Sequence, residues 1–329
     1  MDGIGSSLMN QSSTPRFSVI LPTHNRPALL REALNSLRIQ TFTDWEIIVV
    51  DDASTPPVAL DSEDTRIRII RHATAQGGAA AKNTGIQNAR GELIAFLDDD
   101  DCYEPVYLER ALDVLDHHPE LDVVFMGVTW FGSNGVWGQR NYDLAMEKFQ
   151  SASGGQVIGT LTLFDETVIS ALLKSVPMAL QRPVVRKLAL EQIGNYRPDC
   201  LLWDCDWAIA ATLNVRTGLL SEGLYRQRVD GQGYSSKSDR TVEQMQSGIE
   251  IKERLWRQSR AGKHKQYLDL FRHAAAGGWF DLAWHYYQQG NRALALPALL
   301  KSAQRSLSLA QFKLLTRLLL PSSSGNPKT

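Results

Sequence analysis

The first 128 residues of the chain alternate apolar runs with segments that have helical spacing. The apolar runs are FSVILP (17–22), EIIVVDD (46–52), IRIIRH (67–72), LIAFLD (93–98) and VVFMGV (123–128). Helical patterns separate them at about residues 27–40, 77–91 and 105–118. Strands that are apolar on both faces and alternate with helices form a parallel sheet that is covered on both sides. The sequence therefore predicts an α/β fold with a mostly parallel sheet.

The remaining chain changes composition several times. Residues 129–159 are rich in Gly and Ser and predict loops or an edge hairpin, whereas helical patterns return at residues 164–220. The polar, Gly-rich residues 226–239 predict a loop. Since 329 residues exceed one typical domain, we expect more than one unit. The predicted units are disordered ends at 1–15 and 321–329, a main domain at 16–240 with halves 16–128 and 129–240, and an α-helical region at 241–320.

Charge and cysteine content limit the partners and the location. The net charge is −1, which argues against nucleic acid, although residues 250–317 hold 12 Lys/Arg against four Asp/Glu. Three cysteines without metal-ligand spacing fit a reducing cytosol, and no signal peptide or membrane-spanning run is seen. We therefore expect a cytoplasmic protein. The basic, amphipathic residues 310–320 predict a helix that closes a bundle; the alternative is peripheral contact with the inner membrane surface or a protein.

Acidic residues follow two of the predicted strands. Asp51 and Asp52 end the second run, and Asp98 to Asp101 end the fourth. Ligands of open parallel sheets bind outside the carboxyl ends of the strands, so both groups are expected at one edge. Grouped carboxylates suit Mg²⁺ or Mn²⁺, which bridges to phosphate oxygens. The pattern predicts a site for a nucleoside diphosphate; ordinary turns and a solvated acidic loop are the alternative interpretation.

A family resemblance rests on two stretches of sequence. FSVILPTHNRPALLREALNSLRIQTFTDWEIIVVDDAST and GGAAAKNTGIQNARGELIAFLDDDD resemble the nucleotide-sugar-binding half of family 2 inverting glycosyltransferases. The resemblance covers residues 16–235 and implies the Rossmann-like glycosyltransferase A-type fold. Residues 16–128 would be the nucleotide-binding half and 129–240 the acceptor half. It also implies transfer of a sugar from a nucleoside diphosphate sugar to a glycan or glycolipid acceptor in cell-surface glycan synthesis, with Mn²⁺ or Mg²⁺ as cofactor.

The resemblance carries roles over to individual positions. It assigns to the nucleotide Pro22, Thr23, Asn25, Asp51, Asp52, Lys82, Asn83, Asp98 and Asp99. Asp52, rather than Asp51, matches the acid that accepts a hydrogen bond from uracil, which makes UDP the default donor. Because one acid is added to the family's DxD element, either Asp98 or Asp99 would hold the ribose. Asp100 would bind the metal ion.

The acceptor half supplies the expected base. In CLLWDCDWAIAATL, residues 200–213, Asp204 matches the family's base, and Trp203 replaces the glutamate that normally precedes it. Asp206 is the alternative base, and helix capping is the structural alternative for Asp204. Trp203 and Trp207, four residues apart, would form an aromatic wall for a sugar.

The predicted closing loop departs from the family pattern. Asp230 falls near the position of the family's usual histidine. Asp230 would then be a second metal ligand, or Arg226 and Arg228 would clamp the diphosphate directly. A nucleotidyltransferase is a competing hypothesis, but it would need a Gly-rich loop after the first strand. A non-catalytic sugar-nucleotide binding module is another, and it would have no use for an acid at position 204. The identity of the sugar and the acceptor is left open.

Overall fold

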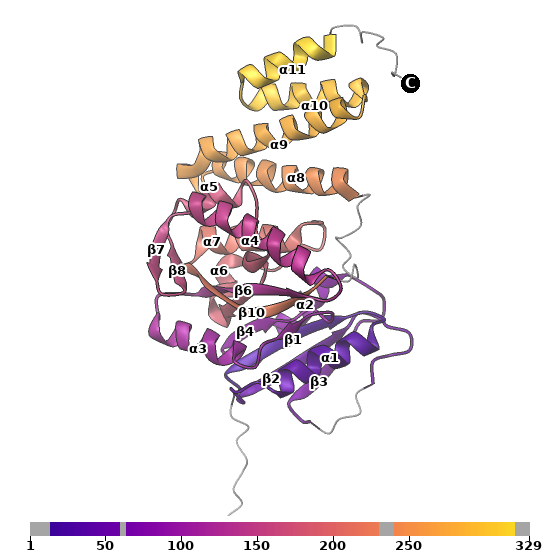
Figure 1. The fold of residues 1–329 in the computed structure, drawn as a ribbon, viewed down its shortest axis with the longest axis vertical. Coiled ribbons are helices and arrows are strands. Elements are labelled where there is room, and N and C mark those ends of the chain that lie inside the picture. Colours follow the sequence, from indigo (N-terminus) through magenta and orange to yellow (C-terminus); the bar gives the residue numbers. More distant parts are fainter. Residues whose placement is uncertain (1–13, 60–63, 230–239, 320–329) are drawn as a thin grey trace, which may run out of the picture.

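The computed structural model describes residues 14–59, 64–229 and 240–319. Their strands form one sheet with the order β3-β2-β1-β4-β9-β6-β10-β8-β7, and β5 pairs with β10 (Figure 1). The strands are β1 Phe17–Thr23, β2 Trp45–Asp51, β3 Ile67–Arg71, β4 Leu93–Phe96, β5 Cys102–Tyr103, β6 Val123–Phe131, β7 Gly155–Ile158, β8 Leu161–Phe164, β9 Pro183–Arg186 and β10 Thr217–Arg228. Each of the five apolar runs is therefore a strand, as predicted.

The sheet is mostly parallel. β1 pairs in parallel with β2 and β4, β2 with β3, and β6 with β10. β9 runs antiparallel between β4 and β6, and the β7–β8 hairpin closes the far edge. β1 and β2 are almost entirely buried, which explains why both read as continuous apolar runs rather than alternating ones.

Helices cover the sheet, so the predicted α/β architecture is confirmed. They are α1 Pro27–Arg38, α2 Gly78–Asn88, α3 Tyr107–His117, α4 Gly135–Ala152, α5 Val168–Leu172, α6 Leu190–Ile193 and α7 Trp203–Asn214. α1 buries Leu30, Ala33, Leu34 and Leu37, the residues whose helical spacing predicted it, and Pro27 stands at its start.

The prediction for residues 129–159 was wrong in its main part. Only the β7–β8 hairpin at its end was anticipated; before it lies α4, a helix of 18 residues. Its glycines suggested a loop, but they serve close packing instead. A Cβ atom at Gly138 would come within 2.9 Å of Val229 and 3.0 Å of Trp130. The loop predicted at 226–239 also begins later, because β10 continues to Arg228, and the residues from 230 to 239 lie outside the described part.

The C-terminal region is helical, as predicted. Its helices are α8 Thr241–Arg260, α9 Leu268–Gln288, α10 Arg292–Arg305 and α11 Leu309–Leu319. They stack above the α/β domain in Figure 1 and share a second apolar cluster that includes Leu282, Leu299 and Leu314. Among the described residues, no helix is long and apolar enough to cross a membrane. The ends predicted to be disordered lie almost wholly outside the described residues.

Candidate active site

The acidic loop after β4 is surrounded by cationic side chains. Asp98 Oδ1 lies 3.0 Å from Lys82 Nζ, and Asp98 Oδ2 lies 3.4 Å from Arg182. Burial opposes ionisation of Asp98, but Lys82 and then Arg182 hold its pKa at about 2. Asp98 is therefore a carboxylate at neutral pH, and its charge is matched by two cations.

The next two acids share Arg26. Asp99 accepts a hydrogen bond from Thr23 Oγ1 at 2.7 Å, and its other oxygen lies 3.0 Å from Arg26. Asp100 lies 3.1 Å from the same guanidinium nitrogen. Burial raises the pKa of Asp99 to about 6, and burial together with the charge of Asp98 raises the pKa of Asp100. Asp98 and Asp100 thus repel each other, which a cation between them would relieve.

Asp101 is the most deeply placed of the four acids. It accepts hydrogen bonds from the Tyr225 hydroxyl at 2.9 Å and from the Arg228 backbone N–H at 2.8 Å. Burial raises its pKa to about 7 although Arg182 lies 3.6 Å away. These hydrogen bonds connect the acidic loop to β10, so Asp101 has a structural role in the site.

Exposure separates the four acids into two pairs. The side chains of Asp98 and Asp100 are 29% and 16% exposed, against 8% for Asp99 and 0% for Asp101. Hard carboxylate oxygens fit Mn²⁺ or Mg²⁺, so Asp98 and Asp100 are the pair whose chemistry and access suit the expected metal ion. Within the described ranges, no group of three or more acidic, histidine or cysteine side chains is already gathered for a metal ion.

Two arginines of this site were not anticipated from the sequence. Arg182 is 5% exposed, contacts Asp98 and Asp101, and stacks 4.6 Å from the centre of the Tyr225 ring. Arg26 follows β1 and bridges Asp99 and Asp100. The available signals were an arginine directly before the segment Pro183–Val185 and an arginine three residues after the first strand.

Asp51 and Asp52 hold the loops at the ends of β2 and β3. Asp51 is fully buried, accepts from Ser54 N at 2.8 Å and is ion-paired with Arg71. Asp52 accepts from the N–H groups of Gln76 and Gly77, each at 2.8 Å, and lies 2.7 Å from His72 Nδ1. A carboxylate has about four acceptor positions, so Asp52 keeps one for a ligand, on Oδ2. Hydrogen bonds hold the pKa of both acids low in spite of burial.

The other residues predicted to contact the nucleotide lie near this edge, but some of their polar groups already bond to the protein. Asn25 accepts a bond from Thr55 N at 2.7 Å, and Pro22 is half-buried in β1. Asn25 and Arg26 also line a pocket of about 370 Å³ between α1 and the loop after β2. Asn83 is occupied, because its amide bonds both the N–H and the carbonyl of Tyr196 at 2.9 and 2.8 Å. Asn83 thus has a structural role, and its contact with the nucleotide stays a prediction.

Of the two tryptophans of the predicted aromatic wall, only Trp203 is accessible from the site. Trp207 is 3% exposed, stacks on Tyr196 and donates to the Gly194 carbonyl at 3.0 Å, so it is a core residue. Its predicted contact with a sugar was therefore wrong, because the helix turns this indole into the domain. Trp203 is half-buried, and its ring lies 4.7 Å from Lys82 Nζ. Trp203 thus keeps access to the site.

Asp204 and Asp206 point in different directions. Two residues correspond to about 200° around an α-helix, and both acids lie in the first turn of α7. Burial alone would lower the pKa of Arg182, but Tyr225, Asp98, Asp101 and Asp204 raise it. Asp204 is therefore close enough to act on Arg182, the arginine before β9 that contacts the acidic loop. Its own Oδ1 accepts a bond from Cys205 N at 2.8 Å.

Asp206 faces the C-terminal helices instead. It is 4% exposed, ion-paired with Arg254 of α8, and 3.9 Å from Arg197. Burial raises its pKa although Arg254 opposes this. α8 also reaches the start of α7, where Ser247 Oγ accepts the Leu202 N–H at 3.1 Å. Asp206 is thus a joint between helices.

The residues of the predicted closing loop reach the site from β10. Arg228 donates to the Asp100 carbonyl at 2.9 Å and is ion-paired with Glu32. Arg226 is 3.3 Å from Glu104, and both guanidinium groups stack on Phe131. Asp230 lies outside the residues that the structure describes.

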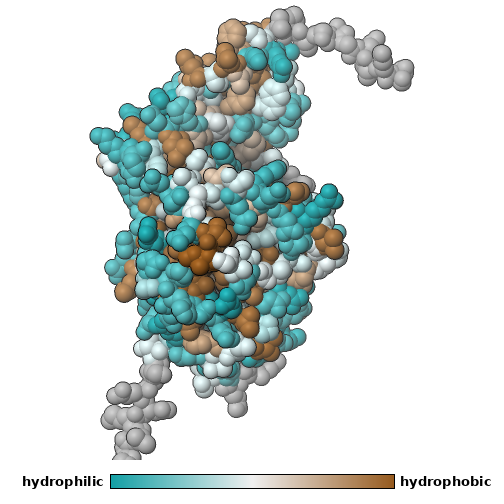
Figure 2. All heavy atoms as spheres, turned by 60° about the vertical axis from the view of Figure 1, so that its left-hand side comes forward, coloured by the Kyte–Doolittle hydropathy of each residue, from teal (hydrophilic) through white to brown (hydrophobic). Residues whose placement is uncertain are grey.

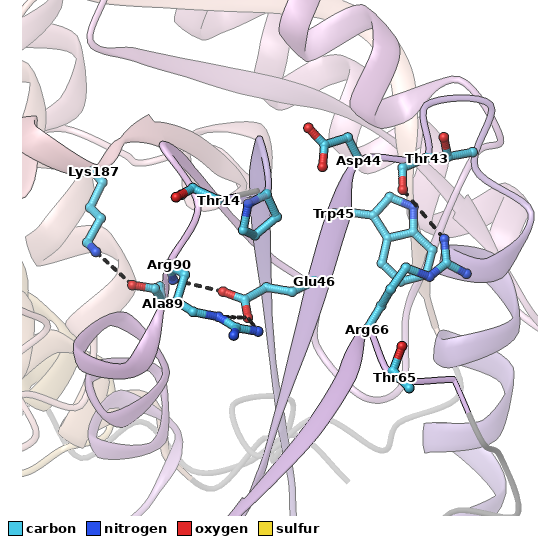
Figure 3. Close-up of a pocket in the computed structure, with 11 residues that line it drawn as sticks. Thr14, Thr43, Asp44, Trp45, Glu46, Thr65, Arg66, Ala89, Arg90 and Lys187 are labelled. Carbon is cyan, nitrogen blue, oxygen red and sulfur yellow. Dashed lines mark hydrogen bonds and ion pairs between the residues drawn. The ribbon is translucent and has the colours of Figure 1, made fainter. Parts of the chain in front are cut away.

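A second pocket, of about 500 Å³, lies at the opposite edge of the sheet. Figure 3 shows Glu46 pointing to Arg90, Lys187 pointing to the Ala89 carbonyl, and Arg66 lying over the Trp45 ring. Glu46 also pairs with Arg68. These charges are matched within the pocket wall, so the pocket is structural rather than a counterpart of the acidic site.

Comparison with solved structures defines the class of fold. The S. aureus TarS 1-349 structure matches with a TM-score of 0.55 at 19% identity, covering 88% of this chain and 80% of that chain. A mannosyltransferase from Pyrobaculum calidifontis, in complex with GDP-Man and Mn²⁺, matches with a TM-score of 0.52 at 18% identity, covering 92% and 79%. The fold is that of the glycosyltransferase A-type enzymes.

Sequence comparison then gives the family. Residues 18–176 match Glycosyl transferase family 2. The chain is 37% identical over 109 residues to an uncharacterized glycosyltransferase of Haemophilus influenzae, covering 33% of this chain and 37% of that protein. It is 34% identical over 101 residues to the Escherichia coli UDP-Glc:alpha-D-GlcNAc-diphosphoundecaprenol beta-1,3-glucosyltransferase, covering 30% and 40%. Residues 18–176 thus resemble glycosyltransferase family 2, as the sequence predicted, and the matched segments span less than half the length of these relatives.

Proposed function

We propose that the chain is a metal-dependent, inverting glycosyltransferase that uses a nucleoside diphosphate sugar, by default a UDP-sugar. The observation that carries the proposal is the division of labour on α7. Asp206 is ion-paired with Arg254, whereas Asp204 raises the pKa of Arg182, the arginine that contacts Asp98 and Asp101. An acid that is near this group of charges and not held in an ion pair with Arg254 suits the role of base for the acceptor.

The cations of the site suit a diphosphate. Lys82, Arg26 and Arg182 surround the acidic loop, and each offers N–H donors to phosphate oxygens when a donor sugar enters. Asp98 and Asp100 would hold Mn²⁺ or Mg²⁺, which when bound neutralises charge on the leaving diphosphate. Thr23 and Arg26 hold the carboxylate of Asp99, which therefore supports the loop. Of the two acids considered for the ribose, Asp98 is the better candidate.

The transfer is a single displacement. The acceptor hydroxyl attacks the anomeric carbon, the bond to the diphosphate oxygen breaks, and the configuration inverts. Asp204 takes the hydroxyl proton, a role that contributes typically about 10²–10⁴-fold to a rate. Trp203 offers a ring face to a sugar, while Arg226 and Arg228 stand at the rim on the β10 side.

The acceptor is proposed to be a glycan or glycolipid of the cell surface. The E. coli relative is named for a diphosphoundecaprenol-linked acceptor, and a Campylobacter jejuni relative, 43% identical over 93 residues, for a PP-undecaprenol acceptor. A TarS structure was solved with UDP-GlcNAc, which supports a UDP-sugar donor. The cytoplasmic location expected from the sequence stays a prediction.

A donor screen tests the proposal. The full chain is incubated with Mn²⁺ and a panel of UDP-, dTDP- and GDP-sugars, and release of the nucleoside diphosphate is measured. We expect hydrolysis of one UDP-sugar above the rest, abolished by EDTA and reduced by Asp204→Asn. Binding of a nucleotide sugar without turnover of any would favour the non-catalytic module and overturn the proposal.

A further inference from the structure

The outer surface of α11 combines exposed apolar side chains with positive charge. The side chains of Leu307, Leu309, Phe312 and Leu319 are 85%, 81%, 64% and 70% exposed, and we call these four residues the α11 surface. Figure 2 shows hydrophobic side chains gathered at this end of the molecule, over the C-terminal helices. Such a concentration of exposed large apolar groups marks an interaction site.

The orientation of α11 is fixed by its inner face. Leu314 and Leu318 are buried in the C-terminal apolar cluster, and Gln311 donates to Ser302 Oγ at 2.7 Å and to the Ser306 carbonyl at 2.8 Å. At about 100° per residue, Leu309, Phe312 and Leu319 project from the side turned away from these anchors. The apolar stripe therefore cannot turn inward without breaking the bundle.

Positive charge lies beside this stripe, and negative charge is missing from the sequence around it. Lys313 and Arg317, one turn apart, are exposed on one flank of α11. The chain has no Asp or Glu after Asp281, whereas the same 48 residues contain six Lys or Arg. A helix with an outward apolar stripe and a basic flank matches the interface of a bilayer with anionic headgroups.

We propose that the α11 surface docks the protein on an anionic lipid bilayer. Leu309, Phe312 and Leu319 enter the boundary between headgroups and acyl chains, with α11 lying in the plane of the membrane, and Lys313 and Arg317 pair with lipid phosphates. A protein partner with an acidic groove would use the charge equally well, but three exposed apolar side chains on an 11-residue helix and a fourth just before it favour a fluid apolar phase. The proposal is independent of the transfer reaction.

Vesicle co-sedimentation of the full chain tests the docking. The probes are phosphatidylcholine vesicles with and without phosphatidylglycerol, at low and physiological salt. We expect binding to the anionic vesicles, weakened by salt, and little binding to phosphatidylcholine alone. Leu309→Ser/Phe312→Ser should weaken partition by about tenfold or more, and Lys313→Gln/Arg317→Gln should lower both the binding and its salt dependence.

Matched variants elsewhere serve as controls. Leu188 and Trp137 are 80% and 68% exposed on the α/β domain, so Leu188→Ser/Trp137→Ser removes similar apolar area. Lys148→Gln/Lys174→Gln removes two exposed charges from the same domain. Both controls should bind like the wild type. If an α11 variant melts earlier than the wild type, Leu307→Ser, in the turn before the helix, replaces it.

Three results would overturn the proposal. The first is that the protein binds neutral and anionic vesicles equally, or binds neither. The second is an equal loss of binding in the control variants. The third is a dimer in light scattering that Leu309→Ser/Phe312→Ser disperses, because a second copy of the chain would then cover the α11 surface.

Discussion

Arg254 of α8 is ion-paired with Asp206 of α7, and the carboxylate is almost fully buried. Through this pair the C-terminal helices are fastened to the helix that presents Asp204. Arg254→Met should cost about 3 kcal/mol, because it breaks a buried pair and leaves the Asp206 carboxylate only the more distant Arg197, at 3.9 Å. It should also lower the transfer rate while nucleotide affinity is kept. Urea unfolding and initial rates at saturating donor measure the two effects.

Further variants distinguish the loss of this ion pair from a general loss of stability. Asp206→Asn added to Arg254→Met removes the buried charge that has lost its nearest partner and should recover most of the lost stability. Arg272→Met on α9 breaks a pair with Asp269, which is 78% exposed, and should change stability by less than about 1 kcal/mol. An Arg254→Met protein that unfolds at the wild-type urea concentration would show that the joint is not energetically important.

Asp204→Asn should retain nucleotide binding and lose transfer by on the order of a hundredfold or more. Asparagine keeps the size of the side chain and can accept the bond from Cys205 N, so the fold should survive. Rates and nucleotide affinity are measured on the same preparation. Asp206→Asn is the matched control and should lower stability with a much smaller effect on the chemical step. A near wild-type rate for Asp204→Asn would move the base to another residue.

UDP should stabilise the protein against heat in Mn²⁺ or Mg²⁺ and much less in EDTA. Without a divalent cation, the repulsion between Asp98 and Asp100 is not relieved and the diphosphate has no metal ion to bind. UDP should then bind more weakly and raise the melting temperature less. Asp100→Asn should remove most of the metal-dependent shift in a thermal melt. Asp269→Asn, which changes an exposed acid of α9, should leave it intact. Shifts of equal size with and without metal would contradict the cation site.

Glu46 predicts a stability change in acid. Burial opposes its ionisation, but hydrogen bonds from Ser18 and then Arg90 hold its folded pKa at about 2, below the ordinary value of 4.5. The unfolded chain therefore binds the proton first, so the stabilisation is full above pH 4.5 and is lost as pH falls towards 2. It amounts to on the order of 3 kcal/mol.

Glu46→Gln removes this pH dependence. The variant should be less stable than the wild type at neutral pH, and the two should converge as the pH falls from 4.5 towards 2. Urea midpoints across this range measure the difference. Glu92→Gln, at a side chain that is 64% exposed, is the control and should follow the wild type. A difference between Glu46→Gln and the wild type that stays constant with pH would refute the role of the carboxylate.

The sheet could be predicted where strands are long and apolar on both faces. The runs at 17–22 and 46–52 correspond to β1 and β2. A strand that is buried on both faces is a continuous apolar run, which can be recognised in a single sequence. β9 was not anticipated, since its four residues gain their strand character from β4 and β6, far away in the sequence. α4 was missed because Gly135 and Gly138 suggested a loop, whereas Gly138 is required by contact with Trp130.

The site was predicted in its acids but not in its cations. Asp98 to Asp101 stand together in the sequence, whereas Arg182 joins them only when β9 is inserted into the sheet. Which of the four acids are accessible to a ligand likewise depends on the residues that contact them. Thr23, Tyr225 and the Arg228 backbone decide which oxygens are covered, and these residues lie 76 or more positions away from the acids they contact.

Asp52 bears on how sequences of this fold are interpreted. Its carboxylate closes the turn at Gln76 and Gly77, so replacing it would disturb the backbone before any ligand is bound. Selection for folding would keep an acid at this position in chains that use guanine, thymine or uracil alike. The presence of the acid in a sequence is consequently weak grounds for assigning the base. The choice among nucleotides has to be sought in side chains that carry no backbone turn.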